Sequence, residues 1–133
     1  MTERWEIAGV AYSGGSFSDG FALDLATLHV PQAVKLRVHH DKRCHYGYGK
    51  LRLCGDELWC DAWIELDDDD PDDCAVLREF GELWSFSVEY FPAREDQNRR
   101  PPHTYRGARI AAVSLCTHPK DPFAVVYRKR RIQ

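Results

Sequence analysis

The sequence predicts a mainly β domain: a small closed β-barrel with one flanking helix. Several short segments alternate apolar and polar residues with period two, glycines and prolines separate them, and only one segment carries helix-start signals. Many short strands with a single helix favour a closed sheet over an α/β sandwich. With 133 residues and 44% hydrophobic content, the chain fits one core, so we expect one domain over residues 1–133.

The first half of the chain predicts a run of strands. The expected segments are residues 5–12, 34–40, 50–53 and 57–64, with a further apolar stretch at 21–28. Gly55 and Asp56 separate the last two segments and predict a hairpin there.

An acidic run at residues 67–73 precedes an apolar-periodic segment and predicts the start of a helix. Asp70 is the expected N-cap and Pro71 the first helical residue, because proline lacks the N–H that this position leaves unpaired. Aspartates in the first turn also offset the positive end of the helix dipole. Gly81 stands where a C-terminal glycine cap is expected.

The strand predicted at residues 84–91 carries apolar side chains on one face and polar side chains on the other. The apolar set is Trp84, Phe86, Val88 and Tyr90, and the polar set is Ser85, Ser87 and Glu89. Beyond it we expect an exposed polar loop at 92–107, a long strand at 108–116, a short edge strand at 124–127 and a basic C-terminal tail at 128–133.

Charge and cysteine content limit the functional classes. The net charge of −3 argues against a nucleic-acid binder that works through bulk electrostatics. Residues 1–6 contain no apolar signal region, and no long apolar run is present, so we expect a soluble intracellular protein without a membrane partner. Five cysteines, an odd number, predict reduced thiols rather than a disulfide framework.

Ser87 and His40 are the candidate reacting pair. A serine nucleophile needs a base within hydrogen-bond reach and a third group that orients the base. Ser87 lies on the polar side of a strand with an apolar second face; the plain alternative is that this polar side is only a solvated strand face. His40 ends a strand, but strict alternation places His39 on the polar face, so His39 is the reserve base.

Several short motifs occur in a fixed order along the chain. They are His40-Asp41, the glycine-containing strand at 47–53, the strand at 59–64, Phe86-Ser87-Val88-Glu89-Tyr90, and Ala112-Val113-Ser114-Leu115-Cys116 followed by Pro119, Pro122 and Ala124. Together they resemble the tailed-phage prohead proteases, serine peptidases related to the herpesvirus assemblins. The resemblance selects Ser87 over Ser85, because the family serine is flanked by aliphatic residues in a similar setting.

The resemblance implies a closed β-barrel of the prohead protease/assemblin type and peptide hydrolysis without a cofactor. Ser87 would attack the scissile carbonyl and His40 would transfer the proton, while backbone amides stabilise the oxyanion. The implied partners are phage major capsid and scaffold proteins, processed inside the procapsid in the cytoplasm of a bacterial host. A homo-oligomer is compatible with this role, and nucleic acid is not required.

Two positions differ from the family pattern. Ala112 stands where the family has its third catalytic member, acidic or histidine, and Glu89 replaces a glycine. Loss of an orienting residue can cost about 10⁴ in turnover, so another group must substitute or activity is weak. The candidate substitutes are Asp41, Glu89, Ser114 and His118. The alternative is a catalytically weakened, protease-fold scaffold or peptide-binding protein in capsid assembly.

A zinc site is the rival hypothesis from the residue types alone. The set of imidazoles and thiols is His39, His40, Cys44, His45, Cys54 and Cys60. Their spacing fits no standard finger, because neither Cys-x-x-Cys nor His-x-x-x-His occurs among them. The sequence therefore predicts no metal.

Overall fold

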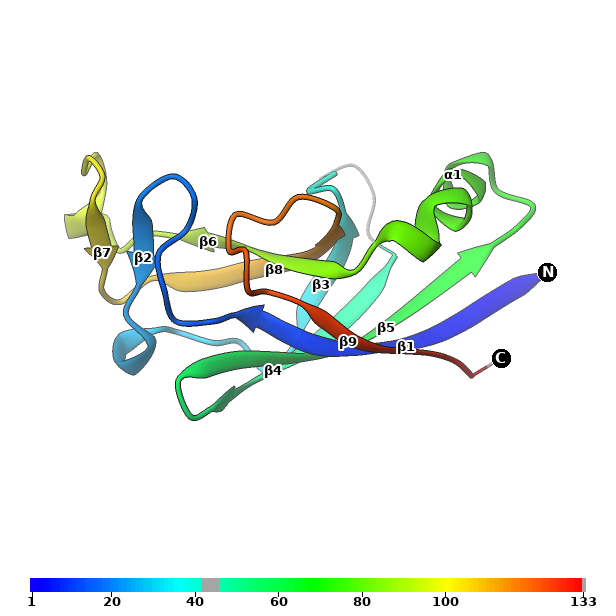
Figure 1. Cartoon of the computed structure of the whole chain (residues 1–133), viewed down its shortest axis with the longest axis horizontal. Helices are drawn as coiled ribbons and strands as arrows, with labels where there is room; N and C mark the ends of the chain where they lie inside the picture. The colour runs from blue at the N-terminus through cyan, green and yellow to red at the C-terminus, as the bar shows by residue number, and fades with distance from the viewer. Residues whose placement is uncertain (42–45, 133) are drawn as a thin grey trace.

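The computed structural model describes residues 1–41 and 46–132 (Figure 1). Within these ranges the strands are β1 (Thr2–Tyr12), β2 (Phe21–Leu23), β3 (Val34–Val38), β4 (Gly47–Cys54), β5 (Glu57–Asp67), β6 (Ser85–Phe91), β7 (His103–Tyr105), β8 (Arg109–Cys116) and β9 (Val126–Arg131). The α-helix is α1 (Pro71–Glu79), and short 3-10 turns cover Leu25–Thr27, Phe80–Glu82 and Arg94–Asp96. In the part of the chain described, no helix is both long and apolar enough to cross a bilayer.

Seven strands form one sheet in the order β6-β8-β3-β4-β5-β1-β9, and β2 and β7 form a separate parallel pair. The β3–β8 contact is parallel, and the other pairings in the large sheet are antiparallel. In Figure 1 the β6–β8 side lies across the β5–β1–β9 side, with α1 toward one end and the β2–β7 pair at the other. The sheet therefore curls around its own inner face.

The two edges of the curled sheet meet at one place. The Phe86 N–H donates to the Ala124 carbonyl at 3.2 Å, and the Val126 N–H donates to the Trp84 carbonyl at 3.0 Å. Among the described residues, the backbone bonds between these edges are confined to this point. The sheet is a curled half-barrel, and the closed barrel expected from the sequence is not shown.

The inner face is built by the period-two pattern that predicted the strands. On β5 the buried residues alternate strictly, and most of the other strands add side chains to the same core. Fully buried members include Ile7, Leu36, Leu58, Ile64, Leu66, Phe86, Ile110 and Leu115. Each such side chain contributes about 1.5–3 kcal/mol through removal of apolar surface from water, which holds the strands of the site in place.

The helix begins as predicted and ends differently. The Asp70 carboxylate accepts the N–H groups of Asp72 at 2.8 Å and Asp73 at 3.3 Å, and Pro71 is the first helical residue. Gly81 is not a C-cap, because the chain continues from the helix into the 3-10 turn. Side chains three residues apart lie on one side of such a turn, so Phe80 and Leu83 are both buried.

Two segments expected to lack regular structure each contain strand residues, although most of their residues are exposed or half-buried. Residues 92–107, predicted as an exposed loop, contain β7, whose Tyr105 is buried and stacks on Phe21 with 5.0 Å between ring centroids. Of the predicted basic tail at 128–133, residues 128–131 lie in β9, paired with β1. There Arg130 Nη2 contacts Glu6 Oε2 at 2.5 Å, so a neighbouring carboxylate offsets the positive charge of the strand.

Asp121 joins the loop after β1 to the segment before β9. The residue is 2% exposed. Its carboxylate accepts the Ser13 N–H at 2.6 Å, the Ser13 hydroxyl at 2.9 Å and the Phe123 N–H at 3.0 Å. Removal of one partner from a buried network leaves the other polar groups unsatisfied, which is the costly case for hydrogen bonds.

Asp121→Ala is expected to lower the free energy of unfolding by about 2–3 kcal/mol, because hydrogen bonds to charged groups contribute about 1.5–3 kcal/mol and three are lost. Urea denaturation followed by circular dichroism measures the change. Asp56→Ala, in the exposed β4–β5 turn, is the control, with a change within about 0.5 kcal/mol. Equal midpoints for wild type and Asp121→Ala would contradict the structural role.

The described cysteines differ in reactivity because they differ in burial. Burial raises the pKa of the Cys60 thiol to about 12, with the nearby Asp61 charge acting in the same direction, and raises that of Cys116 to about 11. At pH 8, iodoacetamide should modify the exposed Cys54 first and leave Cys60 and Cys116 intact until the protein unfolds, since the thiolate is the nucleophile. Peptide mass spectrometry with and without denaturant measures this order, and early modification of Cys60 in the folded protein would contradict it.

Candidate active site

Three neighbouring strands place polar side chains side by side. Arg37 on β3 is in register with Ser114 on β8, which is in register with Ser87 on β6. Glu89 lies two residues along β6, directly opposite Ala112. Because side chains of one parity share a face, these five residues lie on one face of β3, β8 and β6, opposite to the face that bears Phe86 and Val88.

A left-handed turn after β3 brings His40 close to these residues of β3, β6 and β8. β3 ends at Val38, and both His39 and His40 have positive φ, 52° and 58°. Such values are uncommon for residues with a Cβ, and here the turn is held by the His39 N–H bonded to the Leu115 carbonyl at 2.9 Å and the His40 N–H bonded to the Ser114 hydroxyl at 3.1 Å. The strand alternation that favoured His39 therefore stops one residue before it.

The two histidines point to different partners. His39 Nε2 lies 3.0 Å from Glu79 Oε1 on α1, whereas His40 Nδ1 lies 3.1 Å from Glu89 Oε2 and 3.3 Å from Ser114 Oγ. His40, and not the reserve base His39, is thus the histidine beside β6 and β8, the strands that carry Ser87 and Ser114.

Glu89 connects His40 to Arg37. One carboxylate oxygen, Oε2, contacts His40 Nδ1, and the other, Oε1, lies 2.5 Å from Arg37 Nη1. The Ser114 hydroxyl is 3.4 Å from Oε2. Opposite Glu89, the fully buried Ala112 has only a methyl group, which leaves room for the longer side chain across the ladder.

The contact with Glu89 determines the His40 tautomer. A carboxylate can only accept hydrogen bonds, so the proton lies on Nδ1 and the lone pair of the neutral ring lies on Nε2. A general base in a serine hydrolase has its orienting acid on one ring nitrogen and its basic lone pair on the other, and the contact with Glu89 supplies the first of these two features.

Ser87 is buried rather than solvated, being 4% exposed. In the described part of the chain, no hydrogen bond joins it to His40. Directly opposed residues on neighbouring strands have Cβ atoms about 4.5–5.5 Å apart, so Ser87 lies one strand away from Ser114, which does contact His40. The structure places the predicted pair in the same neighbourhood without a formed nucleophile–base hydrogen bond.

The other two candidates for the third member lie elsewhere. Asp41 lines a pocket together with His39 and Glu79 of α1. His118 is exposed, with Nδ1 2.8 Å from the Thr117 hydroxyl. Four residues were candidates to replace an acidic or histidine side chain at position 112. Of these, the structure brings Glu89 and Ser114 to His40.

The described members of the rival zinc set do not lie together in the structure. Cys44 and His45 lie outside the described residues. Cys60 is fully buried on β5, and Cys54 is exposed at the end of β4. The two described histidines of the set, His39 and His40, contact carboxylates on different elements, α1 and β6.

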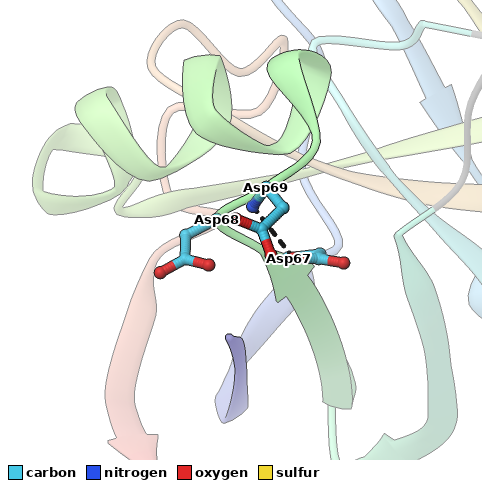
Figure 2. A group of neighbouring side chains, drawn as sticks. All are labelled: Asp67, Asp68 and Asp69. Carbon is cyan, nitrogen blue, oxygen red and sulfur yellow. Dashed lines mark hydrogen bonds between the residues drawn. The ribbon is translucent and has the colours of Figure 1, made fainter.

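A different group, Asp67, Asp68 and Asp69, is the one set of carboxylate, thiol or imidazole ligands that lies within mutual reach in the described ranges. Figure 2 shows it at the end of β5, just before α1, with the Asp69 N–H bonded to Asp67 Oδ1 at 2.9 Å. The Asp68 carboxylate contacts the Met1 amino group at 2.5 Å. These exposed side chains form part of the turn that leads into the helix.

A pocket of about 630 Å³ opens beside the His40–Glu89 pair. Its lining includes Arg37, His40 and Glu89 together with the aromatic rings of Phe21, Tyr90 and Tyr105. Sequence reasoning missed Arg37 and the aromatic lining. The available signal for Arg37 was its parity, since it lies between the buried Leu36 and Val38 on β3 and so had to face the polar side.

Comparison with known proteins identifies the fold. No protein-family model and no curated protein matches the chain. The crystal structure of the KSHV protease in complex with a hexapeptide phosphonate inhibitor superposes with a TM-score of 0.66 and 12% sequence identity, over 96% of this chain and 65% of that chain. The chain has an assemblin-like fold.

This likeness confirms the assemblin-like fold expected from the sequence. It does not show membership of the phage prohead family. The chain spans 65% of the length of the herpesvirus protease, and at 12% identity the likeness concerns the fold alone.

Proposed function

We propose that this protein is a serine endopeptidase in which Ser87 is the nucleophile, His40 the general base and Glu89 the orienting acid. The observation that carries the proposal is the 3.1 Å contact between His40 Nδ1 and Glu89 Oε2, within a protease-like fold. Glu89 supplies the carboxylate that Ala112 cannot supply.

In the proposed reaction, Ser87 Oγ attacks the scissile carbonyl carbon and gives its proton to His40 Nε2. Glu89 accepts the hydrogen bond from Nδ1–H and stabilises the imidazolium that forms. His40 then protonates the leaving amine, and a water molecule, activated by the same nitrogen, hydrolyses the acyl-enzyme. The Ser87 side chain must turn toward Nε2 for the first step; nucleophile–base bonds in unliganded sites are often long and tighten when substrate binds.

We further propose that the substrates are phage capsid or scaffold proteins, cleaved inside the procapsid in a bacterial host. The order of the His-Asp, serine and closing-strand motifs supports this choice, because it resembles that of the prohead proteases. The pocket beside His40 offers space for substrate side chains near the proposed base.

A second candidate function is a protease-fold scaffold or peptide-binding protein with weak catalysis. The 4% exposure of Ser87 and the unformed hydrogen bond to His40 favour this candidate. The two functions differ in whether Ser87 must react, so Ser87 is the residue to test.

A peptidyl aryl phosphonate should label the folded wild-type protein once, at Ser87, since phosphonates react with activated serines. Ser87→Ala should abolish labelling. Ser85→Ala, which removes the preceding hydroxyl of the same strand parity, should leave it unchanged. Glu89→Gln should slow labelling by a factor of about 10² or more, because the amide no longer stabilises the imidazolium. Intact-protein and peptide mass spectrometry measure these outcomes; absence of labelling in folded wild type would overturn the proposal.

The role in assembly is tested by co-expression with candidate capsid and scaffold proteins. Cleavage by wild type and its loss in Ser87→Ala, read by gel and by mass spectrometry of the new termini, is expected. Assembly that requires the protein but proceeds equally with Ser87→Ala would instead establish the scaffold function.

A further inference from the structure

Arg37, which lies on β3 in register with Ser114, has no role in the reaction proposed above. Its guanidinium contacts Glu89 Oε1, and the two side chains are 16% and 15% exposed. Ion pairs shielded from water to this degree are screened less than exposed pairs. The pair lies in the wall of the pocket that also contains His40.

We propose that Arg37 is a positioning residue that holds the Glu89 carboxylate toward His40 Nδ1. This inference rests on the proposed function and names the group on which the orienting acid depends. Arg37 acts through Glu89 and takes no proton in the reaction.

Glu89 needs a residue that holds its side chain in one orientation, because it lies on β6 and His40 follows β3. A glutamate has several rotatable bonds, and Glu89 must reach His40 from the strand that carries the nucleophile. Arg37 occupies one carboxylate oxygen and leaves the other, Oε2, for His40 Nδ1 and the Ser114 hydroxyl. The two oxygens are thereby assigned to different partners, and the rotamer of Glu89 is fixed from both sides.

The rigidity of this arrangement comes from the sheet. Arg37 is the residue of β3 in register with Ser114, and the turn that positions His40 begins two residues later. Arg37, Ser114 and His40 are thus placed by one stretch of parallel pairing. A loss of the guanidinium leaves that backbone in place and releases only the Glu89 side chain.

The chain contains a second arginine–glutamate pair for comparison, which is more exposed, at 64% for Arg130 and 25% for Glu6. Arg130 Nη2 contacts Glu6 Oε2 on strands β9 and β1 at 2.5 Å, the same separation as in the Arg37–Glu89 pair. The described residues provide no histidine contact to that glutamate. Arg130→Gln therefore removes an arginine–glutamate pair from the sheet without touching the site.

The kinetic test is a double-mutant cycle on the rate of phosphonate labelling. Arg37→Gln should lower the maximal inactivation rate by about tenfold or more and change the half-saturating probe concentration by less than about twofold, because base orientation is impaired and probe binding is not. Arg37→Lys should restore part of the rate. In a Glu89→Gln background, Arg37→Gln should have no further effect. Arg130→Gln should match wild type.

Two kinetic outcomes would overturn the inference. Equal factors for Arg37→Gln in the wild-type and Glu89→Gln backgrounds would mean that Arg37 does not act through Glu89. A weaker probe affinity at unchanged maximal rate would mean that Arg37 binds the probe instead. Urea midpoints recorded for each variant identify any general loss of structure.

A second measurement does not depend on activity. Nitrogen-15 NMR of the imidazole rings should find the His40 proton on Nδ1 in wild type and a mixture of tautomers in Arg37→Gln, with Arg130→Gln unchanged. A wild-type protein that fails to label Ser87 would overturn the proposed function, and the NMR comparison would still decide the role of Arg37. An unaltered His40 tautomer in Arg37→Gln would overturn the positioning role itself.

Discussion

The parallel pairing of β3 with β8 joins the two halves of the large sheet, and the candidate site depends on it. β6 and β8 form one side, β4, β5, β1 and β9 form the other, and β3 connects them. Without this pairing, the turn at His40 would have no Ser114 hydroxyl to bond, and Arg37 would not reach across to Glu89. Parallel neighbours come from distant parts of the chain, so the site forms only when the sheet does.

Local signals in the sequence were sufficient for most of the elements. The Asp70-Pro71 start of the helix and the hairpin around Gly55 follow from residues that have one favoured backbone role, and the structure confirms both. The prediction that Gly81 caps the helix was wrong, because burial of Phe80 and Leu83 in the 3-10 turn outweighs the preference of glycine for a C-cap. Most of the 92–107 segment is exposed as predicted, and the strand β7 within it was missed because its pairing partner, β2, lies some 80 residues earlier in the sequence.

The sequence indicated which residues belong to the candidate site better than it indicated which of them contact one another. Strand parity placed Ser87 and Glu89 on one face, and the family resemblance selected His40. Parity opposed His40, because an alternating pattern cannot anticipate two consecutive left-handed residues stabilised by bonds to β8. The sequence alone does not select among the candidate substitutes for an acidic residue at position 112, since Glu89 and His40 are far apart in the chain and meet only through the sheet.

The cross-strand pair of Glu89 and Ala112 has a consequence for how such chains are recognised. The two positions are directly opposed on one face of the ladder, so an acidic side chain could in principle be carried by either strand while the histidine stays in place. Two substitutions, one on each strand, would suffice for the exchange. A motif search that demands an acidic or histidine residue at position 112 would not find the Glu89–His40 contact of this chain. Searches for orienting groups in such sheets should therefore score the ladder partner along with the aligned residue.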